Sequence, residues 1–521
     1  MLNGQSTFTR ESLEKFLDDM DRLDAIESKI LGVQHSGIKE RLRRPNQTEE
    51  EQPDMLPFLF EGDIILNEEQ MNEILSEAEE QLEAKEAKDE NRAVKEPRQR
   101  TLSSSLAGRW SQMPIPYKLS SNVDRNAVMA GIRQWQDNTC IKFRQVYSTS
   151  GQGNMLEFIK GNGCYSNIGR VGRGAQQVSI GRGCESVGTV AHEIGHALGF
   201  YHEQARFDRD SFIRVMTQNI QNGLAGQFSK QSAQRMQTFG IRYDYGSVMH
   251  YGSKGFSTNG RNTIETIDRN YQSTIGQRFG LSFANVKMMN KAYCGGQFVN
   301  LNCQNGGYPD PKDCSKCRCT DGVAGRTCNQ MRSTRTKCGQ LIRASTGTLQ
   351  TLSQSGAGEC NYMITAPAGR RIVLDISSLR FASGAPCPSA FLEVRYANDI
   401  SVTGARLCSG SRVRITSQSN QVIVLYRGSY RSSFSLRYRY DPPTPSGGVT
   451  SPPQTRRPIT QRPTRPATRA TPSPGGQWTQ WSPCSSPCGG CGTQSRQRNT
   501  PFVAYLKSIH PFLISGLSAS K

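Results

Sequence analysis

The distribution of cysteine constrains this chain more than any other feature. All sixteen cysteines of the 521-residue sequence lie at or after Cys140, and most of them are closely spaced. An even number of closely spaced cysteines is typical of disulfide-bonded modules that fold in an oxidising compartment. The alternative is structural zinc in a reduced cytosol, but no two CxxC units stand at the spacing of a zinc ribbon. We therefore expect a secreted protein built from several modules.

Length and hydropathy agree with a modular, secreted chain. A chain of 521 residues exceeds what one hydrophobic core supports, and 50 glycines and 25 prolines indicate many turns and linkers. No apolar run approaches the ~18–20 residues that cross a bilayer, so we expect no membrane span. Residues 1–15 lack the apolar centre of a signal peptide. We therefore expect the sequence to lack its original N-terminus.

Charge is spread unevenly along the chain. The formal net charge is +20, and residues 331–440 hold 15 Lys and Arg against 4 Asp and Glu. A solvated surface is the simplest interpretation of this local excess. If the region has a partner, acidic glycans fit better than nucleic acid, because no nucleic-acid-binding motif accompanies the charge.

One short segment has the spacing of a metal site. The sequence His-Glu-Ile-Gly-His begins at His192, and on a helix positions i and i+4 share a face, so His192 and His196 reach one ion. Glu193 then lies one step round, near a metal-bound water. Gly199 lets the helix end and the chain turn, which returns His202 to the same ion. Three neutral imidazoles leave a position for water, as in a catalytic rather than a structural zinc site.

Two extensions of this motif resemble a known family. His202 opens the sequence H-E-Q-A-R-F-D-R-D, and residues 247–251 read S-V-M-H-Y. HExxHxxGxxH followed by a methionine turn is the metzincin pattern, and the extensions resemble the astacin family of zinc metalloendopeptidases. The resemblance implies an α+β catalytic domain with an active-site cleft, one Zn²⁺ per chain, Met249 as an apolar floor beneath it and Tyr251 as a zinc ligand that swings to stabilise the oxyanion. Without the family, His250 is as good a fourth ligand as Tyr251.

The resemblance also assigns roles to three carboxylates. Zinc and Glu193 would activate the attacking water. Glu203, directly after the third histidine, would hold the N-terminus of the trimmed enzyme. The sequence Phe-Glu-Gly-Asp ending at Asp63 is an ordinary turn when taken alone. Upstream of an astacin domain it becomes a candidate latency switch, in which Asp63 binds the zinc and displaces its water.

Further resemblances cover the rest of the chain. Residues 303–328 resemble an EGF-like unit with five cysteines, in which Cys314 has no expected partner. Residues 338–440 resemble a CUB domain, and Ala390 stands where calcium-binding CUB domains carry Asp, so we expect no calcium site there. Residues from Trp478 resemble the opening of a thrombospondin type-1 repeat. The family pairings imply the disulfides Cys140–Cys294, Cys164–Cys184, Cys303–Cys317, Cys319–Cys328, Cys338–Cys360 and Cys387–Cys408.

These segments predict a multi-domain chain. We expect a pro-region (1–106), an astacin-like peptidase catalytic domain (107–295), an EGF-like module (296–330), a β-sandwich CUB domain (336–441), a Pro/Thr/Ser/Arg-rich linker (442–476), a partial thrombospondin type-1 repeat (477–499) and an unassigned tail (500–521). We expect helices over Asn67–Lys95 (exposed and amphipathic), Val123–Cys140 and Val187–Phe200, and strands over 156–159, 177–180, 372–376, 391–396 and 422–426.

The leading functional hypothesis is a secreted zymogen of a zinc endopeptidase. The basic segment 95–100 has the character of an exposed, protease-cut junction, although the sequence leaves the cleavage site open. The layout resembles nematode astacins linked to hatching, moulting and cuticle. Its substrates would be proteins of extracellular matrix, cuticle or egg envelope, and Arg170, Arg173 and Arg182 could form a pocket for an acidic residue after the cut. A non-catalytic matrix-binding protein is one alternative, but a structural site has no use for Glu193. A growth-factor-like ligand is another, against which the missing EGF cysteine counts.

Overall fold

The structure is a computed structural model that describes residues 10–35, 37, 53–90, 108–172, 174–294, 301–335, 338–344, 349–410 and 412–441. All of these residues belong to one compact unit. The activation segment 95–100, Arg173, the linker and the thrombospondin-like repeat lie outside the described residues. No helix among the residues described is both long enough and apolar enough to cross a membrane.

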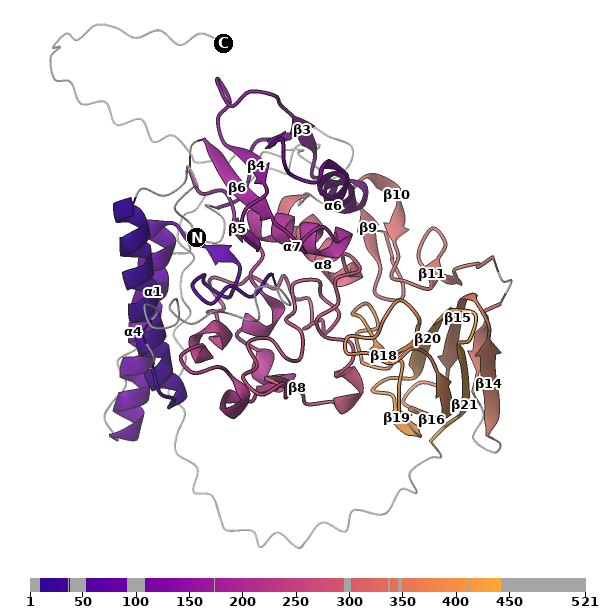
Figure 1. The fold of residues 1–521 in the computed structure, drawn as a ribbon. Helices are drawn as coiled ribbons and strands as arrows, with labels where there is room; N and C mark the ends of the chain where they lie inside the picture. Colours follow the sequence, from indigo (N-terminus) through magenta and orange to yellow (C-terminus); the bar gives the residue numbers. More distant parts are fainter. Residues whose placement is uncertain are drawn as a thin grey trace, which may run out of the picture. The chain divides into compact units, whose positions relative to one another are not determined.

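Two long helices and a short strand form the N-terminal part. These are α1 (Arg10–Leu31), β1 (Ile64–Ile65) and α4 (Glu68–Asp89). Asn67 caps α4 and forms a capping box with Gln70. The two helices lie side by side (Figure 1). The expectation of an exposed helix over 67–95 was wrong in two respects: α4 ends at Asp89, and it buries an apolar face in a core shared with α1. That core includes Phe16, Met20, Leu23, Met71, Ile74 and Leu75.

A mixed sheet is the framework of the catalytic part. Its strand order is β1-β5-β6-β4-β2-β3, with β5 antiparallel to β6 and the other neighbours parallel. The strands are β2 (Ile115–Leu119), β3 (Phe143–Gln145), β4 (Met155–Ile159), β5 (Cys164–Asn167) and β6 (Ala175–Ile180). The predicted strands 156–159 and 177–180 are therefore confirmed, as parts of β4 and β6.

Helices and short elements complete this part of the chain. The helices are α6 (Arg125–Asn138), α7 (Val187–Ala197) and α8 (Phe283–Tyr293), and a small sheet pairs β7 (Ile213–Val215) with β8 (Ile264–Thr266). The 3-10 helices are η1 (Glu203–Ala205), η2 (Arg209–Ser211), η3 (Thr217–Asn219), η4 (Ala225–Phe228) and η5 (Arg269–Tyr271). The two predicted helices here exist but are shorter. Helix α6 starts after its cap Asp124 and ends at Asn138, whereas α7 starts at Val187 as predicted and ends at Ala197, before the turn at Gly199.

Helix α7 packs against α6 and shares one apolar core with α6 and α8. The indole nitrogen of Trp135 donates to the carbonyl of Ala191 at 2.9 Å. At Gly131 a Cβ atom would lie 2.4 Å from Val190, so the glycine lets α6 approach α7 closely. Disulfides join Cys140 to Cys294 and Cys164 to Cys184.

Residues 301–335 form two small antiparallel pairs. They are β9 (Tyr308–Asp310) with β10 (Asp313–Arg318), and β11 (Val323–Ala324) with β12 (Gln330–Met331). Disulfides join Cys303 to Cys317 and Cys319 to Cys328. Cys314 is also disulfide-bonded, so the expectation that it lacks a partner was wrong. The EGF-like assignment itself stays a prediction.

Residues 338–441 form a sandwich of two sheets, as the alternating sequence predicted. The five-stranded sheet has the order β13 (Leu341–Arg343), β15 (Gly358–Thr365), β20 (Gln421–Gly428), β17 (Phe391–Arg395) and β18 (Ala405–Leu407). The four-stranded sheet has the order β14 (Gln350–Ser355), β21 (Ser433–Tyr440), β16 (Ile372–Arg380) and β19 (Val413–Thr416). Disulfides join Cys338 to Cys360 and Cys387 to Cys408.

The sandwich contacts the catalytic part through the turn before β18. Val402 is buried in the same core as α6 and α7. The backbone N–H of Thr403 donates to Asp244 Oδ1 at 3.0 Å, and that of Arg406 donates to the hydroxyl of Thr274 at 2.9 Å. Apolar contact and paired backbone groups together indicate that the two domains pack as one body.

Candidate active site

Helix α7 presents two of the three predicted ligands. The side chain of Ser186 accepts from the backbone N–H of Thr189 and fixes the start of the helix. His192 and His196 then lie one turn apart on the same face, with ring centroids 4.6 Å apart. The helix ends at Ala197, and Gly199 turns the chain with a φ of +104°, as predicted.

The turn brings His202 to the other two histidines. The Nε2 atom of His192 lies 3.0 Å from Nε2 of His196 and 3.3 Å from Nε2 of His202. All three rings are fully buried. Lone pairs on three ring nitrogens this close repel one another unless a cation or protons lie among them, so the arrangement favours a bound cation.

Hydrogen bonds at the opposite ring nitrogens orient these lone pairs. Nδ1 of His192 lies 2.8 Å from the carbonyl oxygen of Val248, and Nδ1 of His196 lies 2.7 Å from that of Phe200. As donors to carbonyls, both Nδ1 atoms carry the proton and leave Nε2 free to bind a metal. Burial also holds the pKa of His192 well below its usual range, which keeps this ring neutral.

A carboxylate from the N-terminal part completes the cluster. Asp63 Oδ2 lies 3.0 Å from Nε2 of His192 and 3.2 Å from Nε2 of His202, and Oδ1 lies 3.2 Å from Nε2 of His196. The four ligand atoms all lie within 4.8 Å of one another. Three imidazoles and one carboxylate are a donor set that suits zinc. The residues present therefore fit a zinc ion.

The turn that carries Asp63 needs unusual backbone angles. Glu61 has a φ of +45° and Gly62 a φ of +82°. A Cβ atom on Gly62 would lie 3.1 Å from the ring of Phe256 and 3.3 Å from the hydroxyl of Tyr251. Both the positive φ and the crowding favour glycine at this position.

Glu193 is the one carboxylate on α7. It is fully buried, and neither of its oxygens has a hydrogen-bond partner among the residues described. Burial, and then the negative charges of Asp63 and Asp54, raise its pKa well above the usual range. A buried, unpartnered carboxylate is costly, so its retention beside a metal cluster indicates a chemical role.

The predicted methionine turn packs against the histidine helix, and the role of Met249 as a floor beneath the metal stays a prediction. At Gly195 a Cβ atom would lie 2.9 Å from the sulfur of Met249, so this glycine lets the methionine approach the histidine helix. His250 is not part of the cluster: its ring nitrogens lie 2.7 Å from the hydroxyl of Tyr243 and 2.8 Å from the carbonyl of Tyr251. The choice between His250 and Tyr251 that the spacing left open therefore goes against His250.

Tyr251 lies beside the cluster and is engaged elsewhere. Its ring centroid is 4.7 Å from that of His202, and its hydroxyl donates to the carbonyl of Glu61. Glu203 is buried, and its Oε1 atom accepts from Arg206 at 3.1 Å and from the backbone N–H of Asp244 at 2.9 Å. Its predicted role as an anchor for a trimmed N-terminus involves residues outside those described and stays a prediction.

Comparison with known proteins places the chain in a family. The sequence matches the Astacin peptidase family over residues 103–294 and a CUB domain over residues 338–438. Zinc metalloproteinase nas-34 of Caenorhabditis elegans is 43% identical over 552 residues, which cover 98% of this chain and 88% of that protein. The chain belongs to the astacin family. Zinc metalloproteinase nas-36 of the same nematode is 34% identical over 460 residues, which cover 85% of this astacin and 71% of the relative.

A solved structure also resembles this astacin. High choriolytic enzyme 1, a hatching enzyme zinc-protease from Oryzias latipes, is 35% identical; the match covers 36% of this chain and 95% of that one, with a TM-score of 0.33. The family match, the relatives and the histidine cluster agree on the activity and the metal. This astacin is a zinc metalloproteinase.

Arg278 contacts the astacin site but belongs to no sequence motif. Nη1 of Arg278 donates to the carbonyls of Val248 and His250, each at 3.0 Å, and its Nη2 pairs with Asp54 Oδ2 at 3.0 Å. The guanidinium therefore joins the methionine turn to the N-terminal part. Sequence reasoning missed it, because only the fold brings residue 278 to this turn.

Of the three arginines that the sequence suggested for a substrate pocket, the structure describes Arg170 and Arg182, and their role stays a prediction. The backbone N–H of Arg170 donates to the carbonyl of Gly108 at 2.6 Å, and its Nε donates to that of Arg109 at 3.4 Å. Arg182 is exposed in the turn after β6. Arg173 is outside the described residues.

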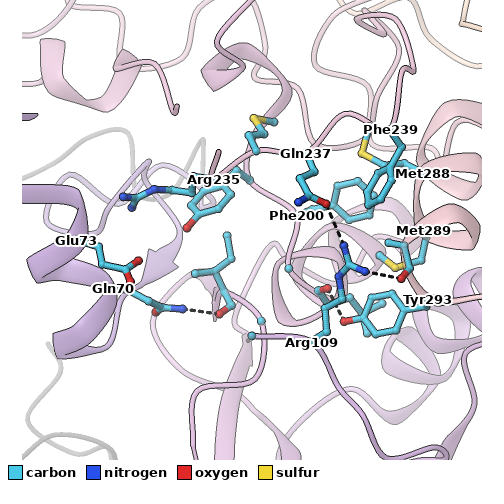
Figure 2. A pocket seen from close by; sticks show the side chains of 18 residues that line it. Gln70, Glu73, Arg109, Phe200, Arg235, Gln237, Phe239, Met288, Met289 and Tyr293 are labelled. Carbon is cyan, nitrogen blue, oxygen red and sulfur yellow. Dashed lines mark hydrogen bonds between the residues drawn. The ribbon is translucent and has the colours of Figure 1, made fainter. Parts of the chain in front are cut away.

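A separate pocket lies beside the end of α7 (Figure 2). Arg109 crosses it, donating to the carbonyl of Ala292 at 2.6 Å and lying over the rings of Phe239 and Tyr293. Gln70 of α4 donates to the carbonyl of Ile168 at its other side. None of the ligand histidines lines this pocket, so it is distinct from the metal cluster.

Proposed function

We propose that this astacin is made as a latent, secreted endopeptidase whose turn at residues 60–63 fills the zinc site until the pro-region is cut. The observation that carries the proposal is the position of Asp63 across all three histidines. A carboxylate there takes the ligand position that a catalytic water needs. The disulfides of the described modules support secretion, because such bonds persist in oxidising compartments.

The same turn occupies the neighbouring functional groups. The hydroxyl of Tyr251 donates to the carbonyl of Glu61. The Glu61 carboxylate lies 2.9 Å from Nδ1 of His202 and accepts from Gln231 at 2.8 Å. The turn thus contacts three functional groups at once. The Glu61 carboxylate contacts the ligand His202, the Asp63 carboxylate lies at the metal position, and the Glu61 carbonyl accepts from Tyr251, the candidate oxyanion group.

The segment after the turn fills the edge of the sheet. Strand β1 pairs in parallel with β5, in the register Ile64 opposite Ser166. The backbone N–H of Ser166 donates to the carbonyl of Asp63 at 2.9 Å, and the Asn167 side chain donates to that of Ile65 at 3.0 Å. An extended peptide binds a sheet edge through such backbone groups. The pro-region therefore competes with substrate for β5.

In the trimmed chain, the remaining groups have defined tasks. When bound, zinc lowers the pKa of water and polarises the scissile carbonyl. Glu193 accepts the proton of the attacking water and passes it to the leaving amine. Tyr251, once released from Glu61, donates its hydroxyl to the developing oxyanion.

We further propose that the substrates are proteins of matrix, cuticle or egg envelope with an acidic residue near the cut. The ion pair between Arg278 and Asp54 supports this preference, because Asp54 leaves with the pro-region. The guanidinium then faces the cleft with an unused N–H pair beside the methionine turn. An Asp or Glu side chain of a substrate would replace Asp54 there.

The catalytic role is tested on the full-length chain made in an oxidising host. We would trim it with trypsin, confirm the cut, and measure zinc per chain and cleavage of denatured collagen beside Glu193→Gln. We expect about one zinc in both proteins and a loss of activity of about 100-fold or more in the variant. Zinc without activity in either trimmed protein would contradict the proposal and leave a matrix-binding protein with a metal-stabilised fold.

A further inference from the structure

The two outer faces of the CUB sandwich differ in character. On the five-stranded sheet, Met363, Ile423 and Leu425 are buried against residues of the preceding module, among them Val323. A Cβ atom on Gly322 would lie 2.4 Å from Leu425, which shows how close this contact is. That face is therefore used within the chain, whereas the outer face of the four-stranded sheet carries exposed polar side chains.

Strand register places four arginines on this second face. Arg437 of β21 lies opposite Asp375 of β16, and Asp375 lies opposite Arg414 of β19. Two residues along β21, Arg439 shares the face, and Arg380 lies opposite Ser433 near the other end. We call Arg380, Arg414, Arg437 and Arg439 the arginine face. Hydroxyl residues share its outward positions: Thr351, Ser353, Ser355, Ser378, Thr416, Ser433 and Ser435.

The arginine face has unused charge. None of its four guanidinium groups forms an ion pair with any carboxylate in the described ranges, although Asp375 lies among them. Other arginines of the domain are paired: Arg395 and Arg406 with Glu393, and Arg427 with Glu359. The more buried arginines of the domain are thus paired, whereas the arginine face gathers on one sheet four guanidinium groups that form no ion pair within the described ranges.

The residue type points to an oxyanion partner. All twelve basic residues between 338 and 441 are arginine, and none is lysine. A guanidinium presents a planar fork that binds sulfate or carboxylate through two hydrogen bonds. Because strands lie about 4.8 Å apart, the rows of Arg414 and Arg437 are about 10 Å apart across β16. This spacing suits a linear polymer with repeated negative groups rather than a single ion.

We propose that the arginine face binds a sulfated polysaccharide of the extracellular matrix. Nucleic acid fits less well, because no aromatic side chain stands at the outward positions of these strands for bases to stack on. A membrane surface fits less well as a partner, because Val373, an apolar residue at an outward position, is buried and so offers no apolar surface for insertion into lipid. The binding itself does not depend on peptidase activity; only its use in placing the enzyme on substrate rests on the proposed function.

The test uses the full-length chain and a fluorescent heparin oligosaccharide. We would compare Arg380→Gln/Arg414→Gln/Arg437→Gln/Arg439→Gln with a control of equal charge loss, Arg133→Gln/Arg214→Gln/Arg261→Gln/Arg343→Gln, whose four arginines are exposed. Anisotropy at physiological salt gives the Kd, and thermal unfolding shows that both variants fold. We expect the first variant to bind at least about 10-fold more weakly and the control to stay within about 3-fold of the wild type.

Three results would overturn the proposal. The first is an equal loss in both variants, which would show that only net charge matters. The second is undiminished binding of the desulfated oligosaccharide. The third is single-stranded DNA of the same length binding as tightly as heparin. Cleavage of a short peptide by the trimmed variants reports separately on the peptidase, so failure of one hypothesis is distinguishable from failure of the other.

Discussion

At the scale of single residues, the site depends on what each side chain contacts away from the metal position. His192 and His196 are oriented by backbone carbonyls that belong to the folded chain itself. His202 differs, because its Nδ1 contacts Glu61 of the pro-region. Trimming as proposed would remove Asp63 from all three histidines, but it would change the Nδ1 partner of His202 alone. Glu193 and Tyr251 differ in a similar way: the Glu193 carboxylate has no hydrogen-bond partner among the described residues, whereas the Tyr251 hydroxyl donates to the carbonyl of Glu61 and would lose that contact in the proposed activation.

Arg278 gives a prediction about specificity. Arg278→Gln should lower the preference for Asp over Ala directly after the cut by at least about 10-fold, since it removes the charge that Asp54 neutralises in the precursor. The measurement is kcat/KM of the trimmed protein on the two matched peptides, with zinc content as a check on the site. An unchanged ratio of the two values would place the specificity elsewhere. Arg182→Gln, in an exposed turn, is the control.

Glu393 gives a prediction about acid stability. Burial alone would raise its pKa, but Arg395 and Arg406 outweigh burial and hold the pKa at about 2, against 4.5 ordinarily. A lowered folded pKa gives stability that is present above pH 4.5 and is lost as the pH falls toward 2. Between pH 5 and pH 2 the wild type should therefore lose about 3 kcal/mol more unfolding free energy than Glu393→Gln.

Urea unfolding of the full-length chain at a series of pH values measures this difference. Glu359→Gln is the control, because Glu359 is exposed and pairs with Arg427 only at 3.8 Å. Equal pH profiles for the wild type and Glu393→Gln would contradict the assignment of the shift to this buried cluster.

The ligands could be predicted from sequence because they are local. Three histidines and Glu193 lie within eleven residues, and helix geometry together with one glycine turn is enough to bring them together. Asp63 came only from the family resemblance, since a four-residue turn has no distinctive pattern of its own. Arg278 could not be predicted at all, because its contacts with Val248 and Asp54 depend on long-range packing.

At the scale of elements, the backbone of α7 lies very close to other parts of the chain at two of its glycines. A Cβ atom on Gly188 would lie 1.9 Å from the carbonyl oxygen of Arg278, and one on Gly195 would lie 2.9 Å from Met249. Both glycines therefore let the histidine helix lie directly against the methionine turn and the segment that carries Arg278. Helix propensity alone would favour alanine at both positions.

Gly188→Ala tests this packing, because propensity and packing predict opposite signs. Propensity predicts a gain of about 1 kcal/mol, whereas overlap with a backbone carbonyl predicts a loss of at least about 2 kcal/mol. We expect the loss of stability, measured as a lower free energy of unfolding, together with a lower affinity for zinc. Gly153→Ala, where a Cβ atom meets nothing within 4 Å, should be close to neutral. A stabilised Gly188→Ala protein would contradict the close approach.

Element prediction succeeded where amphipathic period or alternation was strong. Helix α6 and strands β16, β17 and β20 lie close to their predicted ranges. The apolar face of α6 and one face of each strand pack into a core, and β20 buries apolar residues on both of its faces. Helix α1 was not predicted, since its sequence is highly charged and its apolar face is buried through tertiary contacts, mainly with α4 and also with η4. The burial of α4 was missed for the same reason: each helix supplies the other's apolar partner.

At the scale of the whole molecule, the two accessory segments that the structure describes, 301–335 and 338–441, contact the catalytic domain and each other. The carbonyl of Gly306 accepts from Lys287 of α8 at 3.1 Å, and Arg395 of the CUB domain pairs with Asp321 of the segment 301–335 at 3.0 Å. Thr403 of the CUB sandwich donates to Asp244, just before the methionine turn. Contacts of this kind depend on the folded surfaces of separate modules, which is why the packing of the modules could not be predicted from sequence.

Val402 tests whether the CUB sandwich supports the catalytic domain. It is 5% exposed within the core of α6 and α7, so Val402→Asp would place a charge in that core. We expect a loss of several kcal/mol of unfolding free energy and a fall in peptide hydrolysis by the trimmed protein. Ser377→Asp, exposed on β16, is the matched control. If both variants hydrolyse the peptide as fast as the wild type, the catalytic domain does not depend on the CUB sandwich.

The most direct test of the whole account is peptide hydrolysis by the uncleaved, full-length chain. We predict no hydrolysis by the wild-type precursor and measurable hydrolysis by uncleaved Asp63→Ala, because the variant removes the carboxylate that lies across the three histidines. Asp89→Ala, at the exposed end of α4, should stay as silent as the wild type. If Asp63→Ala is also silent before trimming, yet becomes as active as the wild type after it, then Asp63 is not the group that keeps this astacin latent.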